Sequence, residues 1–260
     1  MPFTLTPGRR AALTVGVPLI LVSAVWNGVS LAALTGRATV TTTTSYDVQG
    51  MHFALFAGGG GVTVTQSPDA QVHVTARVRY GFGSPTMAES VDSAGLHIDS
   101  HCAWYADACS IDLDVSVPAA VALDVETGGG DLRVTGLSAE TRLVSGGGDV
   151  TAIDMSGRLT LVSGGGDVRG VRLSSAQVSA ESSGGNVDVR FAAPPTSVDA
   201  HSSGGDVTVH VPLGQSYRIE ASTGGGDVHV TVPRDDLSVR VLTARSSGGD
   251  VTVVPDGVAR

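Results

Sequence analysis

The chain has 260 residues, a formal net charge of −9 at pH 7, 42% hydrophobic residues, 35 glycines and only 4% aromatic residues. Few aromatic side chains and many glycines favour short strands with tight turns over a helical bundle, in one long domain or two small ones. The acidic balance, with no stripe of Arg outside the N-terminus, excludes a nucleic-acid-binding protein, because nothing neutralises phosphates.

The first segment is predicted to anchor the chain in a membrane. Residues 11–36 contain no charged residue or histidine, and a helix of this length extends about 39 Å, more than the ~30 Å hydrocarbon core. Arg9 and Arg10 precede it, so the positive-inside rule makes residues 1–10 a short cytoplasmic tail and exports the rest as a single-pass protein of the cell membrane. The alternative is a cleaved signal peptide and a secreted protein, since Ser30-Leu31-Ala32 is an acceptable cleavage motif. The apolar run exceeds the usual length of such a peptide, which favours the anchor.

Residues 37–45 include four consecutive threonines and are predicted to form a β-prone stalk. Residues 46–118 are predicted to be an irregular β region. In it, apolar residues alternate from Phe53 to Ala57, then after Gly58-Gly59-Gly60-Gly61 from Val62 to Val64. This segment is predicted to be an atypical first repeat that caps the fold, with Gly61 in place of an acid.

Cys102 and Cys109 lie seven residues apart between two alternating segments. In an exported chain they are predicted to form a disulfide. A metal site that adds His101 is the alternative, but two thiolates and one histidine fall short of a tetrahedral ligand set.

Residues 119–256 contain seven copies of one motif: Ser/Thr, Gly/Ser, Gly, Gly, Asp/Asn, Val/Leu. A period of 18 to 23 residues is typical of one turn of a repeat protein. The acidic positions are Asp131, Asp149, Asp167, Asn186, Asp206, Asp227 and Asp250. The glycines predicted to form the structural turns are Gly129, Gly130, Gly147, Gly148, Gly165, Gly166, Gly184, Gly185, Gly204, Gly205, Gly225, Gly226, Gly248 and Gly249. Residues 257–260 are predicted to be a short C-terminal tail.

Alternation shows where the chain turns within each repeat. The residues eight and six positions before the acid are mostly apolar, the hydroxyl lies four before it, and the residues one and three after it are again mostly apolar. Because the inward positions change parity between hydroxyl and acid, the chain must turn a corner there. Glycine is expected to allow this corner by adopting positive φ.

Stacking such units predicts an all-β, single-chain, right-handed β-solenoid, with insertions gathered at one edge. An antiparallel meander, with each glycine pair in a hairpin turn, is the alternative. Columns of hydroxyls and acids in register favour the solenoid.

Two roles are open for the acids. In one, each Asp accepts hydrogen bonds from the backbone of its own turn, a role that Asn186 also suits. In the other, calcium lies between repeats, and the candidate ligands are Asp131, Asp149, Asp167, Asp206, Asp227 and Asp250. The spacing of calcium-binding nonapeptide repeats is not matched, so turn capping is favoured and no metal site is predicted.

No catalytic residue and no cofactor are predicted. The repeated serines face the interior, which marks a structural role. A polysaccharide-cleaving β-helix would need a groove with catalytic acids and aromatic platforms, and the repeat walls offer only Phe191 and Tyr217.

The Gly-Gly-Gly-Asp-Val and Ser-Ser-Gly-Gly-Asp-Val turns, the two cysteines and the Val-Pro ends at Val117-Pro118, Val211-Pro212 and Val232-Pro233 resemble one bacterial family of unknown function. Its members are named putative adhesins (domain of unknown function 4097). The resemblance covers about residues 46–256 and implies a β-solenoid outside the cell membrane, in some relatives associated with envelope-stress gene clusters.

Together these features predict a non-enzymatic, membrane-anchored, extracytoplasmic adhesin or cell-envelope scaffold. Its expected partner is an envelope or surface protein or polysaccharide. The candidate surface is the irregular region from Gly81 to Asp107, which contains Phe82, Trp104 and Tyr105. An envelope-stress sensor that acts through a membrane partner is the alternative function.

Overall fold

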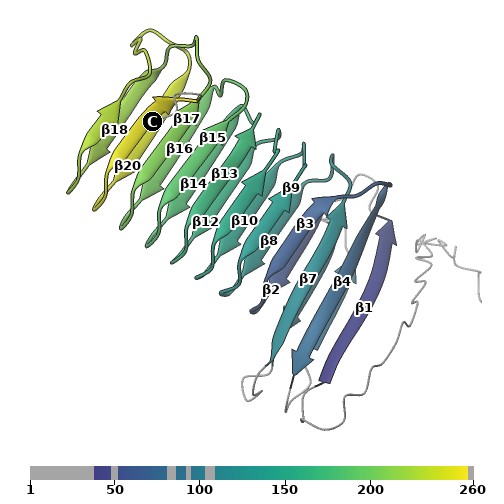
Figure 1. Ribbon diagram of the computed structural model, residues 1–260. Helices are drawn as coiled ribbons and strands as arrows, with labels where there is room; N and C mark the ends of the chain where they lie inside the picture. Colours follow the sequence, from purple (N-terminus) through teal and green to yellow (C-terminus); the bar gives the residue numbers. More distant parts are fainter. Residues whose placement is uncertain (1–37, 48–51, 81–85, 92–94, 103–108, 257–260) are drawn as a thin grey trace, which may run out of the picture.

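The computed structural model describes residues 38–47, 52–80, 86–91, 95–102 and 109–256 (Figure 1). All regular secondary structure in these ranges is β-strand, and no helix among them is long and apolar enough to cross a membrane. The predicted tail (1–10), anchor (11–36) and C-terminal tail (257–260) lie outside the described residues. The same holds for Phe82, Trp104 and Tyr105 of the predicted partner surface.

The strands form two sheets. The strands before the regular repeats are β1 (Ala38–Asp47), β2 (His52–Ala57), β3 (Val62–Gln66), β4 (Gln71–Tyr80), β5 (Thr86–Val91), β6 (Gly95–His101) and β7 (Ser110–Val117). Those of the repeats are β8 (Leu123–Thr127), β9 (Leu132–Thr135), β10 (Thr141–Ser145), β11 (Val150–Ile153), β12 (Leu159–Ser163), β13 (Val168–Leu173), β14 (Gln177–Ser182), β15 (Val187–Phe191), β16 (Ser197–Ser202), β17 (Val207–Val211), β18 (Arg218–Thr223), β19 (Val228–Val230), β20 (Val241–Ser246) and β21 (Val251–Pro255). Sheet A has the order β1-β4-β7-β3-β9-β11-β13-β15-β17-β21-β19, and sheet B has the order β18-β20-β16-β14-β12-β10-β8-β2-β6-β5.

Each turn of the column, here called a rung, contributes one strand to each sheet, and Figure 1 shows the rungs stacked into an elongated two-layer column. Neighbouring rungs pair in parallel and in register; for example, Ser145 of β10 pairs with Ser163 of β12. This parallel stacking confirms the solenoid-like architecture and excludes the antiparallel meander.

The core lies between the sheets and is built from the alternating positions. Val125, Leu143 and Leu161 of sheet B are fully buried, as are Val150 and Val207 of sheet A. Six of the seven repeat hydroxyl residues are also buried, Ser163 and Ser182 at 0% exposure, and Thr223 of the last rung is partly exposed. The predicted change of parity is therefore confirmed: the turn between hydroxyl and acid carries the chain from sheet B to sheet A.

The order of rungs differs from the order of the chain at both ends. The rung β2/β3 lies between β6/β7 and β8/β9, so the expectation that Gly58–Gly61 belongs to the terminal cap is wrong. The rung β6/β7 is the last parallel rung at this end, and beyond it β4 pairs antiparallel with β7 and β5 pairs antiparallel with β6. At the other end, β20/β21 inserts between β16/β17 and β18/β19.

The predicted stalk is wrong for residues 38–45. They belong to β1, which pairs antiparallel with β4 from Ala38 opposite Tyr80 to Asp47 opposite Gln71. Threonine favours strands, and β4 offers an unpaired edge, so the threonines extend sheet A. Tyr46 packs into the core at 5% exposure.

Candidate functional site

The column of turns is the most regular chemical feature of the molecule. In each of the seven repeats the hydroxyl oxygen accepts a hydrogen bond from the N–H of the last glycine of its own turn, as in Gly166 N–H to Ser163 Oγ at 2.9 Å. In six of them the hydroxyl also donates to a glycine carbonyl of the adjacent rung, as in Ser163 Oγ to Gly148 O at 2.8 Å. A buried hydroxyl therefore satisfies its own turn and joins it to the next.

The acids link different rungs. The carboxylate of Asp149 accepts the backbone N–H of Asp167 at 2.8 Å, and Asn186 uses its side-chain oxygen in the same way for Asp206. The expectation that each acid caps its own turn is therefore wrong in one respect. Parallel stacking places the N–H of the next rung above the side chain, so the bond runs between rungs. The pairs, acceptor first, are Asp131/Asp149, Asp149/Asp167, Asp167/Asn186, Asn186/Asp206, Asp206/Asp250 and Asp250/Asp227.

Asp112 extends this ladder and was missed by the sequence reasoning. Its Oδ1 accepts the N–H of Gly61 at 3.2 Å, and Arg79 pairs with its other oxygen. No Gly-Gly pair precedes Asp112, so the motif search could not find it. The available signal was the alternation of Asp112 and Leu113, which repeats the Asp-Val step of the turns. Gly61 has no side chain, so the ladder is interrupted between Asp112 and Asp131.

The repeat glycines are needed for a different reason from the one expected. Among the described glycines, positive φ occurs at Gly60, Gly136 and Gly214, and none of these is in the seven turns. A Cβ on Gly148 would instead collide with the carbonyl of Gly130 in the rung below and lie 2.8 Å from the N of Asp131. Close stacking, rather than left-handed backbone, therefore excludes side chains at the last glycine of each turn.

Two further expectations concern cysteines and metals. Cys102 and Cys109 form the predicted disulfide, with their Cα atoms 5.9 Å apart, so neither thiolate is left for a metal site with His101. The bridge joins the end of β6 to the start of β7. Within the described ranges, no group of three or more His, Cys, Asp or Glu side chains is arranged to hold a metal ion, and this includes the aspartates weighed as calcium ligands.

A Ser-His-Asp contact joins β1 to β4. Ser45 Oγ lies 2.7 Å from Nδ1 of His73, whose Nε2 lies 3.0 Å from Asp69. Ser45 and His73 are register partners in the antiparallel pair, and Asp69 also accepts the N–H of Gln71. Hydrogen bonds from Gln71, Ser67 and His73 lower the pKa of Asp69. This contact therefore holds the edge strand β1 against β4 and against the turn that precedes β4.

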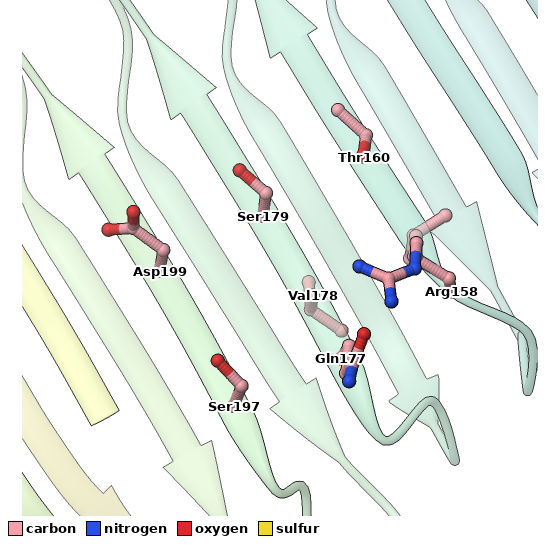
Figure 2. A pocket seen from close by; sticks show the side chains of 8 residues that line it. Arg158, Thr160, Gln177, Val178, Ser179, Ser197 and Asp199 are labelled. Atoms are coloured by element: carbon pink, nitrogen blue, oxygen red, sulfur yellow. The ribbon is translucent and has the colours of Figure 1, made fainter. Parts of the chain in front are cut away.

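The outer face of sheet B carries a polar depression of about 410 Å³ (Figure 2). It crosses β12, β14 and β16, and Leu159 and Val178 also line it. Two rows of side chains point out of the sheet. One row consists of Thr160, Ser179 and Asp199, which are register partners on the three strands. The other consists of Arg158, Gln177 and Ser197. We call these six residues the polar groove.

The two charged side chains of the polar groove are free to bind a ligand. Arg158 and Asp199 form no ion pair with any residue that the structure describes, whereas the next outward pair along sheet B, Arg142 and Asp124, is bonded at 3.0 Å. The sheet itself fixes the spacing: about 4.8 Å between strands and about 7 Å between alternate residues of one strand. The groove is thus lined by a regularly spaced array of hydrogen-bond donors and acceptors.

This architecture agrees with a comparison of the sequence with known families. The model of the Toastrack family, DUF4097, matches residues 99–253. The chain belongs to the Toastrack family. The part that matches the Toastrack model begins within β6 and ends within β21, so β2/β3 precedes it in sequence and yet lies inside the column.

Solved structures with the same fold include a putative adhesin from Bacteroides fragilis NCTC 9343, which is 16% identical and has a TM-score of 0.52. The match covers 83% of this Toastrack chain and 97% of that one. A putative adhesin from Parabacteroides distasonis ATCC 8503 is 12% identical, with a TM-score of 0.47 and coverage of 82% and 97%. A putative lipid binding protein from the same strain is 12% identical, with a TM-score of 0.40 and coverage of 83% and 96%. The curated proteins contain no match to the chain.

Proposed function

We propose that this chain is a non-enzymatic, membrane-anchored Toastrack protein that acts outside the membrane as an adhesin or envelope scaffold and binds a hydroxyl-rich polymer through the polar groove. The apolar segment 11–36 after Arg9 and Arg10 supports the anchor, and the Cys102–Cys109 disulfide suits an oxidising compartment. The likeness to structures named putative adhesins agrees with a binding role.

The composition of the polar groove is the single observation that supports a hydroxyl-rich polymer as the ligand. Hydroxyls, an amide, a guanidinium and a carboxylate stand in two rows on three rigid strands. A polysaccharide presents hydroxyls at regular intervals along an extended chain, and such a ligand can bond several neighbouring strands at once. Rigid strands keep the entropic cost of ordering the site low, so weak single bonds can add up.

The test is co-sedimentation of the purified full chain with insoluble cell-wall fractions. We expect enrichment on the polysaccharide fraction, with Arg158→Ala and Asp199→Ala each weakening binding about tenfold, the size of one charge-assisted hydrogen bond. The matched control is Arg169→Ala, which removes an exposed arginine from the outer face of β13 in the opposite sheet. Absence of enrichment, or equal losses in groove and control variants, would contradict the proposal.

A further inference from the structure

The last rung, β18/β19, leaves the core of the column open. Its inward residues occupy the same register as fully covered residues of the rung beside it: Ile219 pairs with Leu242, Ala221 with Ala244, and Val228 with Val251. Leu242, Ala244 and Val251 are at most 1% exposed, whereas Val228 is 43% exposed and Ile219 and Ala221 are only half-buried. No described strand covers this end, because β18 and β19 are the edges of their sheets.

The opposite end of the column is constructed differently. There the parallel rungs give way to antiparallel strands, with β4 on β7, β1 on β4 and β5 on β6. Soluble proteins protect sheet edges with proline, charge, bulges or a covering segment. Neither β18 nor β19 contains a proline, and although β18 carries the charged residues Arg218 and Glu220, no described segment covers the apolar core beside these two strands.

Exposed apolar side chains gather at this same end. Of the five large hydrophobic residues exposed among the described residues, four lie between residues 213 and 239: Leu213, Val228, Leu237 and Val239. Leu213 belongs to the connection from β17 out to β18, and Leu237 and Val239 belong to the connection from β19 back to β20. The two connections touch, since Ser238 Oγ donates to the Ser216 carbonyl at 3.0 Å. The connections that carry three of these four residues thus lie against each other next to the last rung.

The turn ladder is also unfinished here. Asp227 donates its N–H to Asp250, and Thr223 donates its hydroxyl to the Gly249 carbonyl. In the other rungs, the acidic or Asn side chain and the last glycine of the turn also accept such bonds, but the Asp227 carboxylate and the Gly226 carbonyl accept none from any described residue. The β18/β19 end therefore presents strand edges, apolar side chains and free acceptors together.

We propose that a second copy of this chain covers the β18/β19 end, giving an end-to-end dimer with two-fold symmetry in which β18 pairs antiparallel with β18 of its partner. The charges on β18 favour a second copy of this chain as the partner. Outward residues of neighbouring strands pair by charge in this column, as in Arg245 with Glu220 at 3.2 Å. An antiparallel pair centred on Ile219 sets Arg218 of each copy opposite Glu220 of the other, so the edge is complementary to itself.

A two-fold arrangement also closes the assembly. It buries both open ends in one contact and leaves the β1 and β5 ends at the outside. Head-to-tail stacking of β18/β19 on the β1 end would instead leave an open end on every assembly and produce filaments.

Sedimentation velocity of the purified full chain in density-matched detergent tests the proposal. We expect a concentration-dependent dimer, and Arg218→Glu should raise its dissociation constant at least tenfold, because the new carboxylate would face the carboxylate of Glu220 on the other copy. The exchanged double variant, Arg218→Glu with Glu220→Arg, should dimerise more tightly than Arg218→Glu alone but less tightly than the wild type, because Glu220→Arg also breaks the ion pair with Arg245 within each copy. If Arg218→Glu acted only by unfolding the chain, the second exchange would not recover the dimer. The melting temperature of each variant shows separately whether it is folded.

Thr41→Glu in β1 at the opposite edge is the control and should leave the dimer unchanged. A chain that remains monomeric at all concentrations would overturn the proposal. So would filaments, a dimer broken by Thr41→Glu, or a dimer insensitive to Arg218→Glu.

Discussion

The carboxylate of Asp131 accepts the backbone N–H of Asp149 at 2.9 Å, so a side chain from one rung fixes the position of the next rung 18 residues later. Repetition of this contact explains how acids can stand in a column. Neighbouring carboxylates about 4.8 Å apart repel by about 0.9 kcal/mol even at the dielectric of water. Each bond to the next backbone offsets a cost of this size. The column is therefore a structural device that keeps rungs in register.

Gly148→Ala is expected to destabilise the fold by about 2 kcal/mol or more, because the new methyl group collides with the backbone of the Gly130 turn. The control is Gly147→Ala in the same turn. There the added Cβ finds its nearest neighbour at 3.9 Å, and we expect a neutral or slightly stabilising effect. Urea denaturation followed by circular dichroism measures both. Equal effects of the two variants would contradict stacking as the reason for glycine.

Asp167→Asn is expected to be tolerated, because the amide oxygen can still accept the N–H of Asn186, as Asn186 itself does for Asp206. Asp167→Ala should lower the free energy of unfolding by about 1 kcal/mol, since one hydrogen bond is lost. Melting temperatures of the two variants decide the matter. If Asn destabilises as much as Ala, the charge matters rather than the acceptor.

Gly61→Asn is expected to stabilise the protein by about 1 to 2 kcal/mol. The new side chain fits, with the nearest atom to its Cβ at 3.8 Å, and supplies the acceptor that the N–H of Asp131 lacks at the interruption. Part of the gain comes from restricting the unfolded chain. Gly59→Asn, at a position open to solvent, measures that part alone. Equal gains in both variants would mean that no ladder bond forms at Asp131.

Acid is expected to weaken the outer rung through Asp112. Burial raises the pKa of this carboxyl, but hydrogen bonds from Arg79 and the Gly61 N–H outweigh it and leave the pKa below its ordinary value of 3.8. A lowered pKa in the folded state means that the stabilisation is fully present well above pH 3.8. It is lost as the pH falls through the folded-state value.

Melting temperatures measured from pH 7 to pH 2 test this. Asp112→Asn should show a smaller fall with acid than the wild type, and Arg79→Gln, which removes a main cause of the shift, should do the same. An acid response identical in all three proteins would show that Asp112 does not contribute to it.

Particular residues show how much of the fold and of the candidate site could be predicted from the sequence. The period of the acids from Asp131 to Asp250 and the change of parity after each hydroxyl determined the two-sheet column, because inward and outward positions follow from alternation alone. The Cys102–Cys109 bridge was also correctly predicted. The polar groove was not, because Thr160, Ser179 and Asp199 lie 19 and 20 residues apart and share no motif.

The sequence by itself determined the repeat, the buried hydroxyls and the place of each corner, since these depend on local alternation and backbone geometry. Only the tertiary structure decided the stacking order, because a strand can pair on either side of the column. That choice placed β2/β3 inside, made Asp112 the first acid of the ladder and left β18/β19 open. It also decided that each acid bonds the adjacent rung, because the N–H it reaches belongs to a residue at least 18 positions away.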